Sequence, residues 1–274
     1  MLPRGLTIYL TDKCLISCKH CEIRNKFNGI FLDFEIIKKV LLDCKENKVF
    51  IIGYTGGEAL LHPELFKILE QTYNSGILPV VGISGVRINK NIAKKLSESK
   101  IGCVQVSLDG SSEKVNSIFR GSGVFEDITS GIKLLQDYGV NTNIAICICK
   151  ENFDDYKNLI ELCYDLRAYK LKIQFYMKNY MNRFSELDEN EKNEIVNFIN
   201  EFQHDKKLVD WAVYPNTNNN LGKIHQESLI IFPNGDVQLS EFDNKIGNIN
   251  QNKLSFLYEQ YYLRYVQKDS IERN

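Results

Sequence analysis

Three cysteines stand within eight positions near the start of the chain, in the stretch TDKCLISCKHCEIRN. They are Cys14, Cys18 and Cys21. Three thiolates so close together can hold an iron–sulfur cluster by three of its irons and leave the fourth iron open as a binding site, because such clusters ordinarily take four cysteines. A structural zinc site would need a fourth ligand. The nearby candidate, His20, lies between Lys19 and Cys21, where it would strain a tetrahedron, so the triplet favours a cluster.

The composition is that of an ordinary globular protein. The chain has 274 residues, of which 43% are hydrophobic and 25% charged, and it is long enough to bury one sizeable core. Lys and Arg are dispersed and the formal net charge is -1, which favours neither a nucleic-acid nor a membrane partner. We see no charged leader followed by an apolar run, and no stretch approaches the roughly 18 apolar residues of a membrane span. We therefore expect a cytoplasmic protein with no nucleic-acid or membrane partner.

Short β-rich runs alternate with helical patterns along the first 180 residues. Strands are expected at 5–11, 49–55, 77–84, 103–109, 141–149 and 170–177. Apolar residues at helical spacing predict helices near 33–47, 63–75, 90–99, 124–138 and 153–167, the fourth preceded by a short segment from Ser111. These βα repeats predict an α/β fold with a parallel sheet and helices outside it.

The two faces of the later strands differ in polarity. In the strand expected at 141–149, Ile144, Ile146 and Ile148 share one face, while asparagine, alanine and two cysteines share the other. The strands at 103–109 and 170–177 alternate in the same way. A parallel sheet covered by helices on both sides would be apolar on both faces. One apolar and one polar face instead indicate a barrel or half-barrel whose interior holds a polar ligand.

These features together resemble a known family. The CxxxCxxC spacing of Cys14, Cys18 and Cys21 is similar to the signature of the radical SAM superfamily, and the order of βα units resembles that family's partial (β/α)6 barrel. The resemblance covers about residues 5–180 and implies a radical SAM core at 1–180. It implies one 4Fe-4S cluster on the three cysteines, S-adenosylmethionine (SAM) on the open iron, and an external electron donor such as flavodoxin or ferredoxin. It also implies an enzyme that cleaves SAM reductively to a 5′-deoxyadenosyl radical, which abstracts hydrogen from a substrate.

A second motif follows the second expected strand. In GYTGGEALLHP, Gly56, Gly57 and Glu58 resemble the GGE motif of the family. Two glycines allow the backbone to approach a ligand closely, and a carboxylate can receive an ammonium group. The resemblance implies that this ammonium belongs to the methionine part of SAM. The alternative interpretation is a helix-entry turn in which Glu58 caps the helix.

Further cofactor-binding residues are implied by the resemblance. At the end of the fourth strand, in SLDG, Ser107 and Asp109 would touch the ribose or shape the pocket. Arg120, in IFRGSG, resembles the arginine that binds the methionyl carboxylate, and His20 would lie near the adenine. The third strand ends in Ser-Gly where the family commonly has Asn-Gly, so Ser84 would take the place of that asparagine. Inward-facing residues of the sixth strand are candidates for adenine or substrate contacts; these are Lys172, Gln174 and Tyr176.

The region after residue 180 has a different pattern. A charged helix at about 188–204, a turn at PNGD and a last helix from about Leu254 predict an accessory region at 181–274. It resembles the C-terminal (SPASM-like) extension of peptide-modifying radical SAM enzymes, in which cysteines bind auxiliary clusters. Here Gln238, Leu239 and Ser240 replace the cysteine expected after the hairpin, and no cysteine follows Cys163. We therefore predict a single cluster and a tail that serves as scaffold or substrate platform.

Two further cysteines bear on the reaction. Cys147 and Cys149 are expected to point inward near the mouth of the barrel, where a thiol could return a hydrogen atom to a substrate radical. The alternative is that both are small apolar fillers, as free cysteines often are. The leading hypothesis is a radical SAM enzyme that crosslinks or epimerises a ribosomally synthesised peptide. The alternatives are a radical SAM enzyme acting on a small molecule such as a nucleotide, and a non-enzymatic iron–sulfur or zinc sensor.

Overall fold

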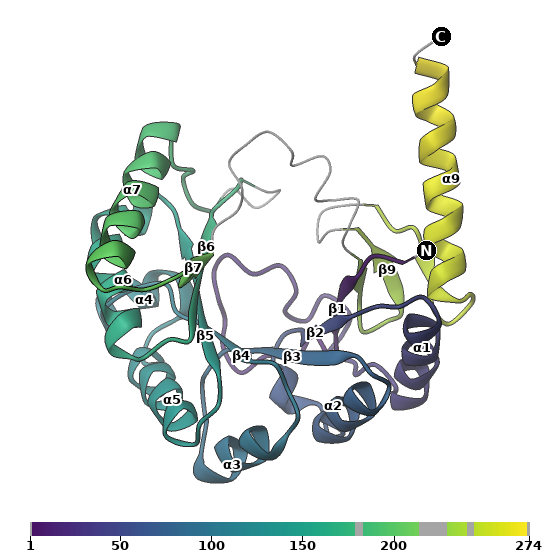
Figure 1. Cartoon of the computed structure of the whole chain (residues 1–274), viewed down its shortest axis with the longest axis horizontal. Coiled ribbons are helices and arrows are strands. Elements are labelled where there is room, and N and C mark those ends of the chain that lie inside the picture. The colour runs from purple at the N-terminus through teal and green to yellow at the C-terminus, as the bar shows by residue number, and fades with distance from the viewer. Residues whose placement is uncertain (1, 179–182, 214–228, 240–243, 273–274) are drawn as a thin grey trace. The chain divides into compact units, whose positions relative to one another are not determined.

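The computed structural model describes residues 2–178, 183–213, 229–239 and 244–272 (Figure 1). The chain forms two compact units. Unit 1 comprises residues 1–14, 23–81 and 218–274, and unit 2 comprises residues 15–22 and 82–217. The division at residue 180 into a core and an accessory region remains a prediction.

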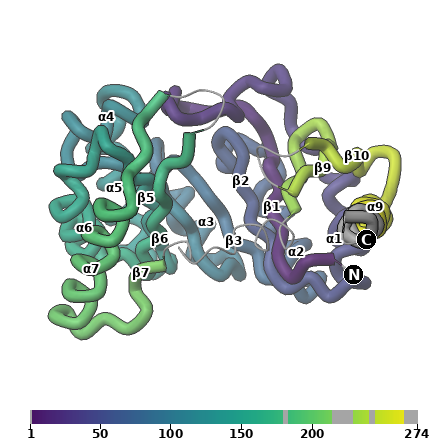
Figure 2. Tube along the Cα trace, turned by 90° about the horizontal axis from the view of Figure 1, so that it is seen from above, coloured from purple at the N-terminus to yellow at the C-terminus, as the bar shows by residue number. Residues whose placement is uncertain are grey.

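Unit 1 is built on parallel strands that a C-terminal hairpin extends. β1 lies beside β2 and β2 beside β3 (Figure 2), and both pairs are parallel. β8 adds in parallel to the other side of β1, with Thr7 opposite Ile230. β8, β9 and β10 pair antiparallel in turn. The strands are β1 (Gly5–Tyr9), β2 (Ile51–Thr55), β3 (Leu78–Ile83), β8 (Ile230–Ile231), β9 (Asp236–Gln238) and β10 (Gly247–Asn248).

The helices of unit 1 are α1 (Phe34–Glu46), η1 (Ala59–Leu61), α2 (Leu65–Asn74) and α9 (Leu254–Glu272). Asp33 caps α1 because its carboxylate accepts hydrogen bonds from the backbone N–H groups of Glu35 (2.7 Å) and Ile36 (3.3 Å). Asp43, near the end of the same helix, accepts hydrogen bonds from the backbone N–H and the hydroxyl of Ser255, at 2.8 and 2.7 Å. These two bonds fix the start of α9 beside α1.

Unit 2 is a second set of parallel strands with intervening helices. β4 (Val104–Ser107), β5 (Thr142–Ile148), β6 (Lys170–Phe175) and β7 (Ala212–Val213) pair in parallel in that order. The helices are α3 (Lys90–Glu98), α4 (Glu113–Arg120), α5 (Phe125–Asp137), η2 (Lys150–Asp155), α6 (Tyr156–Asp165) and α7 (Glu189–Asp205). β7 was not predicted, because a strand of two residues leaves no readable alternation.

The predicted α/β fold is confirmed, including each of the strands expected before residue 180 and the hairpin at PNGD. The two faces of β5 also differ as predicted. Ile144, Ile146 and Ile148 are buried, whereas on the other face Asn143 and Cys147 are half-buried and the small Ala145 between them is buried. Burial of one face of a sheet under helices is the main hydrophobic contribution to such a fold. Within the described residues, no helix combines the length and apolarity needed to cross a membrane.

Candidate functional site

The segment before Cys14 is hydrogen-bonded to the segment that follows Cys21. In unit 1 the backbone N–H of Leu32 donates to the carbonyl of Leu10 (2.8 Å), and that of Asn25 donates to the carbonyl of Asp12 (3.1 Å). The buried carboxylate of Asp12 also accepts from the backbone N–H groups of Phe27 and Gly29. Sequence reasoning missed Asp12, although its place two residues before the first cysteine was a signal. The loop therefore has a fixed base.

The two glycines of GGE pack against the backbone that leads to Cys14. The N–H of Gly57 donates to the carbonyl of Thr11 (2.7 Å), and the thiol of Cys14 lies 3.2 Å from the carbonyl of Gly57. A Cβ on Gly56 would lie 2.2 Å from the carbonyl oxygen of Thr11, and a Cβ on Gly57 would lie 2.2 Å from that of Lys13. Both glycines thus lie very close to the backbone of Thr11 and Lys13, which leads to Cys14.

Glu58 completes this junction. Its backbone N–H donates to the carbonyl of Lys13 (2.7 Å), and its fully buried carboxylate accepts from the N–H of Leu60 (3.2 Å) at the start of η1. This is the helix-entry cap that the alternative interpretation expected. The predicted contact of Glu58 with an ammonium group stays a prediction.

Cys18 and Cys21 belong to unit 2 and are half-buried. The backbone N–H of Lys19 donates to the carbonyl of Phe119 (2.7 Å), and the carbonyl of Lys19 accepts a hydrogen bond from the guanidinium of Arg183. The second half of the cysteine motif is therefore held against the last turn of α4.

A buried ion pair lies beside Cys18. Nε of Arg120 is 2.7 Å from Oδ2 of Asp109, and Nη1 of Arg120 donates to Sγ of Cys18 at 3.7 Å. The side chains of Arg120 and Asp109 are 10% and 0% exposed. Burial by itself would lower the pKa of Arg120, but Asp109 and Cys18 raise it, with a net rise that keeps the guanidinium charged.

Cys147 bonds the carboxylate of Asp109, and two asparagines that sequence reasoning missed bond its backbone. Its Oδ1 accepts from the N–H of Cys147 (2.8 Å), and its own N–H donates to Oδ1 of Asn116 (3.1 Å). The amide of Asn152 donates to the carbonyls of Asp109 and Cys147, both at 2.9 Å, and accepts from the N–H of Cys149 at 2.9 Å. Buried asparagines that bond the backbone in this way hold the ends of β4 and β5 in register.

The two predicted catalytic cysteines pack against the same aromatic cluster but differ in burial. Cys149 is fully buried and packs with Phe119, Tyr176 and Phe184, which matches the filler alternative. Cys147 is half-buried, and its N–H contacts Asp109. Burial, with a further contribution from Asp109 and an opposing one from Arg120, raises the pKa of the Cys147 thiol to about 12.

His20 lies at the edge of the same cluster. Its Nε2 is 4.0 Å from Oδ2 of Asp109, and its ring centroid is 6.3 Å from that of Phe119 and 6.4 Å from that of Phe184. Burial lowers the pKa of His20, although Asp109 opposes the shift and Arg120 adds to it. Its buried Nδ1 makes no hydrogen bond to any residue that the structure describes.

The remaining predicted residues differ in their burial. Ser84 is buried, and its hydroxyl accepts from the N–H of Val86 at 3.3 Å. Ser107 is half-buried on β4, and Gln174 is exposed on β6 opposite Cys147. Tyr176 follows the end of β6 at Phe175, and its buried ring packs with Cys149, Phe119 and Phe184. Ser240 lies outside the described residues.

Unit 2 thus brings His20, Asp109, Arg120 and Cys147 together around Cys18, while unit 1 brings the GGE residues to Cys14. None of the eight cysteines, all of which lie in the described part of the chain, forms a disulfide. In the described ranges no group of three His, Cys, Asp or Glu side chains is placed to hold a single metal ion. Separate irons of a cluster each take one thiolate, so cluster binding does not require the three thiols to converge on one point.

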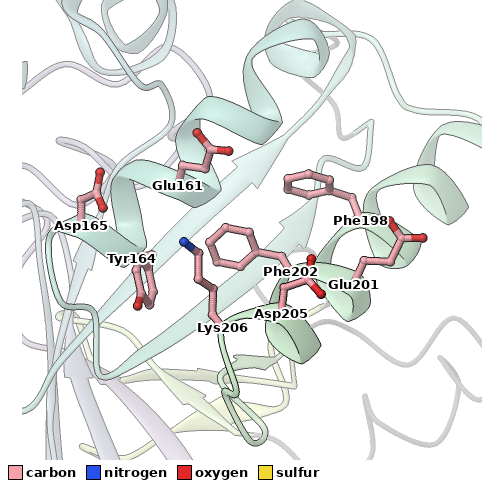
Figure 3. Close-up of a pocket in the computed structure, with 8 residues that line it drawn as sticks. All are labelled: Glu161, Tyr164, Asp165, Phe198, Glu201, Phe202, Asp205 and Lys206. Carbon is pink, nitrogen blue, oxygen red and sulfur yellow. The ribbon is translucent and has the colours of Figure 1, made fainter.

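A separate groove lies between α6 and α7 (Figure 3). Its volume is about 560 Å³, and carboxylates and aromatic rings line it together with one lysine; these residues are Glu161, Tyr164, Asp165, Phe198, Glu201, Phe202, Asp205 and Lys206. The ammonium of Lys206 lies 5.0 Å from the ring centroid of Tyr164 and 5.7 Å from that of Phe202. The groove includes no predicted site residue among those that the structure describes.

Comparison with known proteins gives two kinds of likeness. The sequence model of the radical SAM superfamily matches residues 8–163, more than half of the chain. The AdoMet-dependent heme synthase of Oleidesulfovibrio alaskensis is 28% identical over 164 residues, which are 58% of this chain and 42% of that protein. The mycofactocin maturase MftC of Mycolicibacterium smegmatis is 27% identical over 154 residues, 56% of this chain and 39% of that protein. The chain thus spans about two fifths of the length of these relatives.

Solved structures show the fold. The crystal structure of Streptococcus suis SuiB bound to S-adenosylmethionine superimposes with a TM-score of 0.81, at 15% identity, over 95% of this chain and 66% of that one. SuiB has also been solved with the precursor peptide SuiA, and that structure superimposes with a TM-score of 0.80 at 16% identity, over 94% of this chain and 64% of that one.

Proposed function

The chain belongs to the radical SAM superfamily, and from that premise we propose that Cys14, Cys18 and Cys21 hold a single 4Fe-4S cluster whose open iron receives SAM. Members of this family are enzymes whose cofactors are such a cluster and SAM, so the non-enzymatic sensor is set aside. When bound, these cofactors supply a one-electron reductive cleavage of SAM that generates a radical able to abstract hydrogen from an unreactive carbon. The electron comes from an external donor such as flavodoxin or ferredoxin.

The environment of the thiols supports this assignment. All three cysteines are half-buried, and none of them forms a disulfide. Cys14 is positioned by the carbonyl of Gly57 (3.2 Å), and the cationic Arg120 lies 3.7 Å from Cys18. A nearby cation favours the thiolate, which is the form that binds iron.

The residues that bind SAM are proposed from the same neighbourhoods. In unit 1, Glu58 receives the methionine ammonium, and Gly56 and Gly57 position it. In unit 2, His20, Ser84, Ser107, Asp109, Arg120 and Gln174 contribute contacts to the nucleoside and the methionyl carboxylate. Tyr176 contributes from within the aromatic cluster by shaping the pocket wall.

We further propose that the substrate is a ribosomally synthesised peptide, with crosslinking or epimerisation as the outcome. The support is the shared fold with SuiB, a protein solved with a precursor peptide. Residues 181–274 act as a scaffold or substrate platform without an auxiliary cluster, because no cysteine follows Cys163. A small-molecule substrate is the second candidate, and the likeness to a heme synthase favours it.

For epimerisation, Cys147 is the better hydrogen donor of the two predicted cysteines. Both cysteines pack against the same aromatic cluster, but Cys147 is half-buried whereas Cys149 is fully buried. Replacing each cysteine by serine separates them: loss of solvent deuterium at the product carbon is expected for Cys147→Ser alone. Equal incorporation in both variants would exclude Cys147.

Release of 5′-deoxyadenosine tests the function as a whole. The anaerobically reconstituted chain is expected to release it from SAM on reduction, and Cys18→Ala is expected to lose this activity. Adding a short peptide encoded beside the gene should increase the release and change the mass of the peptide, whereas nucleotides and porphyrins should do neither. Stimulation by a small molecule alone would replace the peptide hypothesis, and robust product from Cys18→Ala would refute the cluster assignment.

A further inference from the structure

The guanidinium of Arg120 bridges a thiol and a carboxylate inside unit 2. Its Nη1 donates to Sγ of Cys18 at 3.7 Å, and its Nε lies 2.7 Å from Oδ2 of Asp109. Arg120 is the last residue of α4, and the carbonyl of the preceding residue, Phe119, accepts the N–H of Lys19. The helix end therefore holds both the cation and the cysteine loop, which fixes their separation.

Asp109 cannot easily move away from this cation. Its second oxygen accepts from the N–H of Cys147 (2.8 Å), its own N–H donates to Asn116, and its carbonyl accepts from Asn152. The side chain of Asp109 has no solvent exposure and that of Arg120 has 10%. Charges shielded from water in this way interact more strongly than charges on a surface.

We propose that Arg120, held in place by Asp109, is a positioning residue that sets the reduction potential of the cluster bound at Cys18. This inference rests on the proposed cysteine ligation. Reduction adds one electron from the external donor to the cluster, and no bond of Arg120 or Asp109 forms or breaks. Local charge and hydrogen bonds to the ligand sulfurs are among the levers that set such potentials. A cation that donates to one sulfur stabilises the more negative, reduced state and raises the potential, while the paired carboxylate limits the rise.

An electrostatic role of Arg120 and a purely structural role predict different effects on the reduction potential. If Arg120 only packed α4 against the cysteine loop, its loss would lower cluster content or stability without moving the potential of the cluster that remains. If it acts on the cluster electrostatically, removal of the cation and removal of the anion shift the potential in opposite directions. The pair of substitutions therefore separates the two roles.

The test is an anaerobic redox titration of the reconstituted full chain without SAM. The electron paramagnetic resonance signal of the reduced cluster monitors the titration. Arg120→Gln is expected to lower the ratio of reduced to oxidised cluster at a fixed potential by about tenfold, which is about 59 mV for a one-electron couple. Arg120→Lys, which keeps the charge, should recover most of this loss. Asp109→Asn should shift the ratio the other way.

Arg167 provides a matched control, because its guanidinium lies 2.7 Å from Asp137 in an equally short pair that is exposed to solvent. Arg167→Gln should titrate like the wild type. Variants that bind a full cluster yet titrate at the wild-type potential would overturn the inference and leave the proposed function intact. If Arg120→Gln takes up no cluster, an unshifted Asp109→Asn overturns the inference on its own. A wild-type chain that assembles no cluster would instead contradict the proposed function.

Discussion

The two ends of the cysteine motif are held by different means. In unit 1, the backbone of residues 11–14 is hydrogen-bonded to the backbone of Gly57 and Glu58, and a Cβ on Gly57 would lie 2.2 Å from the carbonyl oxygen of Lys13. In unit 2, the backbone contact at Lys19 is supplemented by a buried network of side chains around Asp109 and Arg120. Backbone hydrogen bonds and close packing thus position Cys14, whereas Cys18 lies beside the charged side chain of Arg120.

This difference has a functional consequence. Backbone contacts fix the position of a ligand but carry no net charge that could tune it. Side-chain charges can tune a bound metal group and can be removed one at a time. We therefore expect substitutions in the first region to alter folding and assembly, and substitutions in the second to alter redox behaviour as well as stability.

The largest expected effect belongs to the first region. Gly57→Ala places a methyl group 2.2 Å from the carbonyl oxygen of Lys13, which should cost about 3 kcal/mol or more of unfolding free energy. Gly53→Ala is a matched control in the preceding strand, because its added Cβ meets its nearest atoms at 3.7 Å. Urea unfolding of the cofactor-free chain measures both. Equal unfolding free energies of the two variants would contradict the proposal that close backbone packing positions Cys14.

Loss of Asn152 should have the next largest effect. Asn152→Ala removes three hydrogen bonds of 2.9 Å from a buried site and leaves their backbone partners unsatisfied, at an expected cost of about 2 to 3 kcal/mol. Asn141→Ala, which loses one 3.5 Å bond at an exposed position, is expected to change stability by less than about 0.5 kcal/mol. A cost below 1 kcal/mol for Asn152→Ala would show that side chains contribute little to unit 2.

The smallest effect is expected for a side chain in the backbone-held region. The hydroxyl of Thr11 donates to the carbonyl of Ile30 (2.7 Å) and accepts from the N–H of Lys13 (3.1 Å). Thr11→Val removes both bonds but leaves the backbone bonds from Gly57 and Glu58, so a loss of about 1 kcal/mol is expected by the same unfolding measurement. A larger loss of unfolding free energy for Thr11→Val than for Asn152→Ala would contradict the view that side chains matter less near Cys14 than near Cys18.

Much of the fold and half of the site could be predicted from the sequence. Strand alternation, helical spacing and the cysteine and GGE spacings are local patterns, and they located β1 to β6 and the residues around Cys14. The sequence also indicated Asp109, Arg120, His20 and Cys147, but not the two asparagines that support them. Buried residues such as Asn116 and Asn152 are recognised only by partners that the fold brings from other elements. The aromatic neighbours of Tyr176 could not be predicted either, because Phe119 and Phe184 come from other parts of the chain.

Counting iron tests the central claim most directly. After anaerobic reconstitution, the wild type should hold about four irons and four sulfides per chain. Alanine at Cys14, Cys18 or Cys21 should abolish this content, whereas Cys103→Ala, a change at another half-buried cysteine, should leave it unaltered. A wild-type chain without iron and sulfide, or a full complement in all three variants, would contradict the account.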